Sequence, residues 1–574
     1  MKKSLSVFIK ISVCLFICLL SNHTYSQVDS LHYIPPMCSF TSLSSNVDDH
    51  QMVLTTSETT PFDVTVTNND GSFIRTVSGL SNTNPQKISL NFSAYTSASN
   101  KTTAKGLGSQ GVIGTNQLNV ILDTEGLIVS GPKKFFVSIQ QKSSAQGDLL
   151  TSKGTTGLGT DFYSGHMFSS KGGYDSHNGH FISVMASENN TNITFNNPRV
   201  HFKDHPKSFT VGLDKGESYV IGISITDLKK QTSNLNQVNG THITSNKPIA
   251  VSSGSWCASG YPNSNPGRDV GFDQLVPTDV VGDEYIIIKG LGRSGGAQYN
   301  EKVLVVATET NTTVTYKDNL KTKTLVNAGD YFFTSISDFS NTTNGNIYIH
   351  ADKKVFVYQT LSGANKKQTA GFCFIPPLKC TADKEVTIAF ANKLSSLTVN
   401  PILKLVTQSG SQIKLNGVNL QNASTYRKTV PGNTYWETYN IPKSELQKSK
   451  YRGGSNWIYK ISSTGALNVM LAFESSNVGG GGFFSGFGDI PEVKQNPDIA
   501  ENGLCGNNVV LMASGFTSYN WYRDGGIVSG ENNATFQPTG PGRYKVTGLS
   551  PCGGSTTESF PSNEIRILPC LYIK

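Results

Sequence analysis

The stretch ISVMASENNTNITF at residues 182–195 recurs as VLVVATETNTTVTY at residues 303–316. Both copies contain, in the same order, an apolar strand, a small residue, an acidic residue, a polar turn and a second apolar strand. This order predicts a duplicated β-hairpin. Self-similarity of this kind indicates a repeat architecture, so the fold is interpreted module by module.

A second repeated unit follows the first in each copy. It is THITSNKPIAVS at residues 241–252 and IYIHADKKVFVY at residues 347–358, and it returns less completely as LIVSGPKKFFVS at residues 127–138 and YKISSTGALNVM at residues 459–470. We expect four modules, of which the divergent first and last cap an open stack. The expected divisions are a signal peptide (1–26), a divergent first β-module (27–157), a second (158–278), a third (279–380), a fourth (381–485), a linker (486–500) and an Ig-like domain (501–574).

Length and composition agree with many small β-modules. A chain of 574 residues is too long for one hydrophobic core. Charged residues make up only 15% of it and glycines number 56, which favours short strands and tight turns over surface helices. We therefore predict an all-β fold of tandem β-sandwich-like modules, with a propeller-like repeat as the alternative and almost no helix beyond the leader.

The N-terminal segment has the features of a secretory signal. Lys2 and Lys3 precede an apolar run at residues 11–20, and a cleavage site lies before Gln27. Lys10 interrupts the apolar run, which leaves roughly half of the ~20 residues that a membrane-spanning helix needs. We expect a secreted or cell-surface protein whose mature chain has no membrane span.

The net charge of the chain gives no indication of a nucleic-acid partner. It is +8, and it falls to +5 when the three leader lysines are removed. Basic runs interleaved with aromatic residues are absent from the sequence. We therefore expect no nucleic acid among the partners.

Removal of the leader leaves seven cysteines, an odd number, so at least one thiol stays free or pairs between chains. Export favours disulfides over metal thiolates, although the sequence does not give the pairing. The disulfide candidates are Cys38, Cys257, Cys373, Cys380, Cys505 and Cys552.

The C-terminal part resembles an immunoglobulin-like sandwich of bacterial surface proteins. Cys505, Trp521, Tyr544 and Cys552 follow in the order of such a domain, with Trp521 expected at its centre. In antibody domains the tyrosine lies two residues before the second cysteine, whereas Tyr544 lies eight residues before Cys552. The similarity is therefore to the Ig-like or PKD-like domains of Bacteroidota surface proteins.

Motifs for catalysis, cofactors or metals are weak. Two GxGxxG matches, at residues 106–111 and 290–295, are expected to be turns because no helix follows to receive a pyrophosphate. Glu188 and Glu309 occupy equivalent repeat positions, which favours a structural role. We predict no catalytic, cofactor-binding or metal-binding residues and a protein that is not an enzyme; a glycan-active hydrolase with paired carboxylates is the alternative.

Several segments together resemble the N-terminal domain family of the IgG-Fc-binding protein, which includes secreted bacterial members. The segments are GTDFYSG (159–165), ISVMASENNTNITF (182–195), GTHITSNKPIAVSSGSWCA (240–258), DQLVPTDVVGDEYII (273–287) and VLVVATETNTTVTY (303–316). The resemblance implies an extracellular adhesive or ligand-binding role and supplies no catalytic residues.

We expect a non-enzymatic adhesion protein that recognises a glycan or protein through the loops of its modules. The candidate ligand contacts are Trp256, Tyr261, Phe483 and Phe484, with burial of Trp256 beside Cys257 as the alternative for that residue. A structural component of a surface assembly or filament is the second possible function.

Overall fold

The structure is a computed structural model, and the strands named below form its sheets and hydrophobic cores. It describes residues 27–39, 49–91, 109–143, 146–170, 177–228, 234–258, 260, 269–290, 301–340, 345–362, 370–475, 478–487, 492–496, 509–514, 516, 518–552, 555–559, 561–562 and 564–567. The expected signal peptide lies outside these residues. The described chain is mostly β, which confirms the predicted fold class.

The first three modules share one strand order around a long central strand. The first contains β1 (Asp29–Ile34), β3 (Asp49–Thr55), β4 (Phe62–Thr67), β5 (Ile74–Leu80), β6 (Gln86–Ser89), β9 (Leu127–Ser143) and β10 (Gln146–Thr151). The second contains β11 (Leu158–Tyr163), β12 (Gly179–Ala186), β13 (Thr191–Asn196), β14 (Ser208–Leu213), β15 (Ser218–Ser224), β16 (His242–Ala258) and β17 (Asp269–Gln274). The third contains β18 (Gly282–Ile288), β19 (Lys302–Ala307), β20 (Thr312–Tyr316), β21 (Lys321–Leu325), β22 (Tyr331–Phe333), β23 (Asn346–Ser362) and β24 (Ala370–Phe374).

Each long strand, β9, β16 and β23, has 17 residues and pairs with different strands along its two halves. In β16 the N-terminal half pairs with β11 and β13, and the C-terminal half pairs with β12 and β17. The middle of the strand is polar, and the register with β11 shifts there. Bulges bend strands and let them pass from one sheet to the other, which explains the polar centre of the second repeated unit.

The predicted β-hairpin of the first repeated unit is wrong. The two strands at residues 182–195 become β12 and β13, but β12 pairs with β15 and β16, and β13 pairs with β14 and β16. The equivalent strands β19 and β20 both pair with β23. The short polar turn therefore joins strands that pair with opposite halves of the long strand, and the long strand supplies the partner that a hairpin would have supplied.

The fourth module and the last unit complete the fold. The fourth module contains β25 (Glu385–Ile388), β26 (Lys393–Leu394), β27 (Leu397–Thr398), β28 (Asn400–Gln408), β29 (Ile413–Leu415), β30 (Val418–Asn419), β31 (Arg427–Thr429), β32 (Trp436–Ile441), β33 (Tyr459–Ser463), β34 (Leu467–Glu474) and β35 (Gly479–Phe483). The last unit contains β36 (Glu492–Asn496), β37 (Val510–Ser514), β38 (Ser518–Arg523), β39 (Gly526–Ile527), β40 (Thr535–Phe536), β41 (Gly542–Cys552), β42 (Ser555–Glu558) and β43 (Ile565–Ile567).

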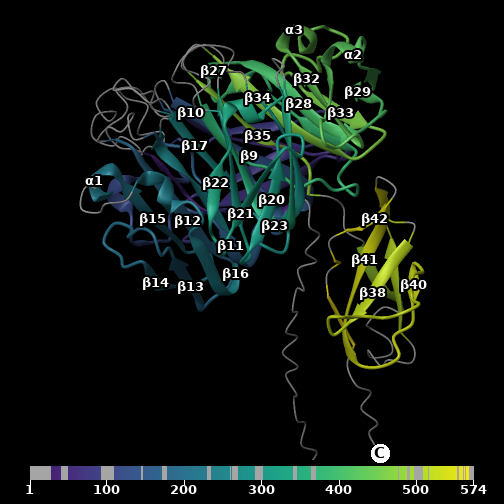
Figure 1. The fold of residues 1–574 in the computed structure, drawn as a ribbon, viewed down its shortest axis with the longest axis horizontal. Helices are drawn as coiled ribbons and strands as arrows, with labels where there is room; N and C mark the ends of the chain where they lie inside the picture. Colours follow the sequence, from purple (N-terminus) through teal and green to yellow (C-terminus); the bar gives the residue numbers. More distant parts are fainter. Residues whose placement is uncertain are drawn as a thin grey trace, which may run out of the picture.

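The last unit is an Ig-like sandwich with a hydrophobic core of its own, and it lies beside the four modules (Figure 1). Trp521 is fully buried at its centre and stacks on Phe536. The Tyr544 hydroxyl donates to the Gly540 carbonyl 2.8 Å away, a short-range bond of the kind found in tyrosine corners. β36 pairs with β37, so part of the expected linker belongs to this unit.

Helices and isolated strands are few among the described residues. They are α1 (Ile225–Leu228), α2 (Ala423–Tyr426), α3 (Lys443–Leu446), four short 3-10 helices (Thr115–Gln117, Gly154–Gly157, Leu235–Val238 and Ile336–Asp338), the parallel pair β2 (Met37–Ser39) and β7 (Val112–Gly114), and β8 (Ile121–Leu122), which pairs with β15. In the described part of the chain no helix is long and apolar enough to span a membrane.

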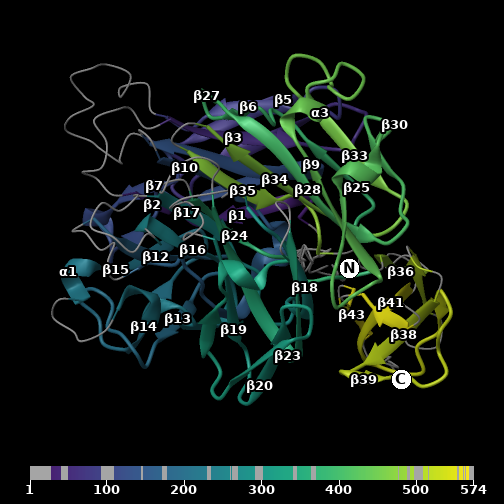
Figure 2. The ribbon, with the colours of Figure 1, turned by 45° about the horizontal axis from the view of Figure 1, so that its top comes forward.

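The inner strands of the modules form a closed ring. β10 contacts β17, β17 contacts β24, β24 contacts β35, and β35 contacts β10, so these four strands lie together at the centre of the body (Figure 2). The cores follow the same circle, because each contains side chains from two neighbouring modules. Phe136 and Leu149 of the first module share a core with Phe473 of the fourth. The expected open stack with capped ends is therefore wrong, since the first and last modules bury apolar surface against each other.

Four equivalent backbone bonds align the inner strands residue by residue. The amides of Ser152, Leu275, Ile375 and Phe484 donate to Val137, Val251, Val357 and Val469, with distances of 2.8 to 2.9 Å. Four residues earlier stand Asp148, Gly271, Gly371 and Gly480. A Cβ atom would lie 2.3 Å from the Asp148 Oδ1 on Gly480 and 3.0 Å from it on Gly371, so these two glycines leave the space that the carboxyl group fills.

Two buried histidines predict that the second module loses stability in acid. His166 and His180 are fully buried with ring centroids 5.1 Å apart, and His166 Nδ1 lies 3.0 Å from the Gly254 carbonyl oxygen. Burial lowers the pKa of His166 to about 4 and that of His180 well below its ordinary value. The unfolded chain, with a histidine pKa of about 6.5, binds more protons below that pH, so stability falls as the pH decreases from about 6.5 to about 4.

For His166 alone the expected loss between pH 7 and pH 4 is about 3 kcal/mol of unfolding free energy. Urea unfolding at several pH values measures it. His166→Asn keeps an N–H donor near Gly254 and should show a shallower pH dependence, whereas His350→Asn, at a side chain that is 49% exposed, should keep the wild-type slope. Equal slopes in all three proteins would contradict the assignment to His166.

Candidate functional site

The structure places Trp256 in the core. Its side chain is 3% exposed, and Nε1 donates to the His177 carbonyl oxygen 3.0 Å away. The indole fills space above Gly179 and Gly222, where a Cβ atom would lie 2.0 Å and 2.8 Å from ring atoms. Trp256 is therefore buried next to the buried Cys257, as the alternative interpretation of the sequence stated, and it is not an exposed contact.

Phe483 and Phe484 are also buried. They lie at the end of β35 and directly after it, and the Phe484 ring stacks on Phe136 with centroids 4.8 Å apart. The glycine-rich run before them forms a buried inner strand of the ring, where neighbouring strands lie too close for larger side chains. The expectation that these two rings present an exposed ligand surface is therefore wrong. Tyr261 lies outside the described residues.

The cysteine candidates divide into one disulfide and three thiols. Cys380 forms a disulfide with Cys552, with Cα atoms 5.6 Å apart. Cys38, Cys257 and Cys373 are buried and not disulfide-bonded. The prediction that these three cysteines are disulfide candidates is therefore wrong. Cys505 lies outside the described residues. The disulfide joins the segment that follows the third module to β41 of the Ig-like unit, so it fastens that unit to the ring.

The structure has two clefts that adjoin each other. The first has a volume of about 570 Å³ and the second about 780 Å³, and both are lined by Asp279 and Lys354. The first is otherwise lined by Thr155, Leu158, Gly159, Thr160, Asp161, Tyr163, Pro248, Pro277, Thr278 and Thr308. The second is otherwise lined by Lys379, Tyr522, Asp524, Gly525, Arg543, Lys545, Thr547, Glu558, Ser559, Pro561 and Glu564. We call the two together the junction groove, because residues of the second module, the third module and the Ig-like unit line it, with Thr155 at the end of the first module.

The first part of the junction groove is held by a polar cluster. The Tyr163 ring stacks on His242 with centroids 4.4 Å apart, and His242 Nε2 lies 3.0 Å from Asp161 Oδ2. The Thr278 hydroxyl donates to Asp161 Oδ1 at 2.5 Å. Burial would raise the pKa of Asp161, but the bonds from His242 and Thr278 hold it below its ordinary value. Asp161 therefore presents a fixed carboxylate at the wall of the groove.

The second part of the groove has charges of both signs. The basic side chains are Lys354, Lys379, Arg543 and Lys545, and the acidic ones are Asp279, Asp524, Glu558 and Glu564. The Tyr522 hydroxyl lies 3.1 Å from Glu558 Oε2, and Lys354 Nζ donates to the Asp279 carbonyl oxygen at 2.7 Å. The balance of charge suits a ligand with many hydrogen-bonding groups and little net charge.

Sequence patterns did not identify this groove, because its residues range from Thr155 to Glu564 along the chain. One signal was available: Lys354 lies in the polar centre of the long strand β23, where two sheets meet. Among the described residues no group of three or more His, Cys, Asp or Glu side chains is placed to hold a metal ion.

Comparisons with known proteins give one informative match. A family model described as "IgGFc binding protein" matches residues 149–472, which is more than half of the chain. No curated protein matches the chain.

Solved structures that match include the ICAM-5 D1–D4 ectodomain fragment (9% identity, 71% of this chain, 99% of that chain, TM-score 0.12). A structure described as concerning host cell surface retention of a 1.5-MDa bacterial ice-binding adhesin has 9% identity, covers 61% of this chain and 90% of that chain, and has a TM-score of 0.08. Sidekick-1 immunoglobulin domains 1–5 have 10% identity, cover 92% and 98%, and have a TM-score of 0.09. Scores this low support no inference.

Proposed function

Because the chain belongs to the IgGFc-binding protein family, we propose that it is a secreted or surface-displayed, non-enzymatic adhesion protein that holds a glycan or protein ligand in the junction groove. The observation that supports this is the groove itself, in which three units of the fold contribute polar and charged side chains to two adjoining clefts. Ligand sites commonly lie between domains, where loops from a rigid scaffold converge. An extracellular location agrees with the disulfide between Cys380 and Cys552.

The ligand class follows from the chemistry of the groove. Eight charged side chains of balanced sign, a tyrosine ring and several hydroxyls offer hydrogen bonds along an extended path. A neutral glycan or a peptide segment of mixed charge matches this surface better than a polyanion does. Immunoglobulin Fc, which the family name mentions, is one protein to test among others.

The test is a binding screen of the purified chain against mucin, immunoglobulin Fc and arrays of host and microbial glycans, with product formation followed in the same samples. We expect saturable binding without turnover. Release of product would favour a hydrolase instead.

Lys354→Glu should weaken binding of the identified ligand by at least about tenfold, equivalent to about 1.4 kcal/mol, because Lys354 lines both clefts. Lys353→Glu is the matched control: this neighbour donates to the Thr310 carbonyl oxygen and lines neither cleft. Titration of the ligand against both variants measures the difference. Equal affinities in the two variants would place the binding surface elsewhere.

A further inference from the structure

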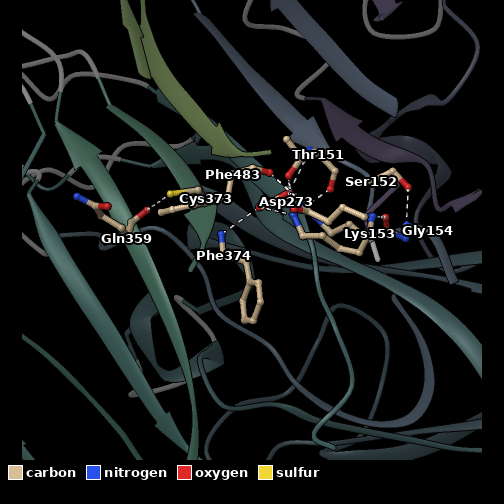
Figure 3. Close-up of polar contacts among 11 residues, drawn as sticks. Thr151, Ser152, Lys153, Gly154, Asp273, Gln359, Cys373, Phe374 and Phe483 are labelled. Carbon is tan, nitrogen blue, oxygen red and sulfur yellow. Dashed lines mark hydrogen bonds and ion pairs between the residues drawn. The ribbon is translucent and has the colours of Figure 1, made fainter. Parts of the chain in front are cut away.

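The centre of the ring contains a lysine and an aspartate that are both completely buried. Lys153 follows β10, and Asp273 lies in β17 of the second module. The Lys153 Nζ lies 3.1 Å from each carboxyl oxygen of Asp273 (Figure 3). Isolating an ion pair from water is costly, and it often contributes little to stability compared with apolar packing. An amine and a carboxyl group that lie this close together and away from water therefore suggest a reaction between them, in addition to a structural role.

Burial shifts both groups toward their neutral forms. It lowers the pKa of Lys153 and raises the pKa of Asp273, although the attraction between the two groups opposes each shift. The neutral pair consists of an amine with a free electron pair and a carboxylic acid. These are the two species that condense to an amide, because an ammonium ion is not a nucleophile and a carboxylate is a poor electrophile.

The neighbouring groups are arranged as such a condensation requires. The Thr151 hydroxyl oxygen lies 2.5 Å from Lys153 Nζ and 3.3 Å from Asp273 Oδ1, so it touches both the nucleophile and one carboxyl oxygen. The Phe374 amide of β24 donates to the other oxygen, Oδ2, at 3.1 Å. A backbone N–H in this position stabilises negative charge that develops on Oδ2.

The second buried carboxyl group of the ring, Asp148, accepts backbone N–H bonds from Leu149, Phe372 and Gly481. Asp273 also accepts three backbone N–H bonds, from Thr151, Gln274 and Phe374, so the bonds from the lysine distinguish the two carboxyl groups. The hydrogen bonds from Lys153 Nζ run to Thr151 and Asp273. Asp273 is therefore the acyl partner that the geometry selects.

We propose that Lys153 and Asp273 become joined by an intramolecular isopeptide bond. Nζ attacks Cγ of Asp273, a C–N bond forms, and the carbonyl electron pair moves to Oδ2, where the Phe374 amide holds it. A proton passes from Nζ through the Thr151 hydroxyl to Oδ1, the C–Oδ1 bond breaks, and one water molecule leaves as the carbonyl re-forms. The reaction changes no oxidation state and uses no co-reactant.

The bond would join the segment after β10 to the inner strand of the second module. Its closure constrains the unfolded chain between residues 153 and 273, which is the way in which a covalent cross-link stabilises a fold. Burial of Thr151, Lys153 and Asp273 keeps bulk water away from the amide and so disfavours its hydrolysis.

Mass spectrometry of the purified, denatured full chain tests the proposal. The expected mass is one water lower than the mass calculated from the mature sequence and its disulfide. Peptide mapping should give one branched peptide that contains both Lys153 and Asp273, since trypsin does not cleave after an acylated lysine. An intact mass without this loss, together with an unmodified Lys153 peptide, would overturn the proposal and leave a buried ion pair.

Two variants separate the chemistry from folding. Lys153→Arg keeps a positive charge but cannot form the amide, so its mass should show no loss of water. Thr151→Val removes the hydroxyl that passes the proton, and the cross-linked fraction soon after synthesis should be several-fold lower than in wild type. An unchanged cross-linking rate in Thr151→Val would remove Thr151 from the mechanism. The wild-type mass decides the main question even if both variants fail to fold.

Discussion

Replacement of Asp148 by alanine is expected to lower the free energy of unfolding by about 3–5 kcal/mol. The Asp148 carboxyl group accepts the backbone N–H groups of Phe372 at 2.8 Å, Leu149 at 2.9 Å and Gly481 at 3.2 Å. Burial raises the pKa of Asp148 well above its ordinary value. The cost arises because each buried N–H group that loses its acceptor lowers the free energy of unfolding by about 1–3 kcal/mol.

The Phe372 and Gly481 amides belong to the inner strands of two other modules, so Asp148→Ala tests the closed ring directly. Urea unfolding followed by intrinsic fluorescence measures the change. Asp63→Ala is the matched control, because Asp63 accepts the Gly79 amide at 3.0 Å from an exposed position of β4. Its loss should stay below about 1 kcal/mol, since water replaces the acceptor. Similar losses in both variants would show that Asp148 does not hold the ring together.

Gly240→Ala is expected to destabilise the contact between the second and third modules by about 3 kcal/mol. Gly240 has a φ of +71°, and a Cβ atom there would lie 1.9 Å from the Gly329 carbonyl oxygen. Arg199 donates to that same oxygen at 3.0 Å and to the Asn239 carbonyl oxygen at 2.6 Å, so the backbone segments cannot separate without losing its bonds. The methyl group therefore forces the two modules apart.

The control for this prediction is Gly410→Ala. Gly410 has a similar φ of +81°, but a Cβ atom there meets nothing within 4 Å. It should cost only the strain of a left-handed conformation, about 1 kcal/mol. Thermal unfolding of both variants measures the difference, and equal losses would mean that the close approach of Gly240 and Gly329 contributes nothing.

The candidate site was less predictable than the fold. Trp256, Phe483 and Phe484, the expected exposed ligand contacts, are core residues. Their rings belong to hydrophobic cores that neighbouring modules share, and a single loop sequence does not reveal such a core. The junction groove brings together Asp161, Lys354 and Tyr522 from three units. No local pattern relates these positions, so only their placement by the sheets brings them to one surface.

The sequence by itself determined the fold class, the repeated modules and the Ig-like character of the last unit. Strand alternation, frequent glycine and the repeated apolar-polar-apolar strand are patterns of residues close together in the sequence, so the sequence alone reveals them. The pairing of β12 and β13 with β16 instead of with each other, the closure of the ring and the disulfide from Cys380 to Cys552 were decided by the tertiary structure. These contacts join segments far apart in the chain, and which segments meet depends on how all of the modules bury their apolar faces together.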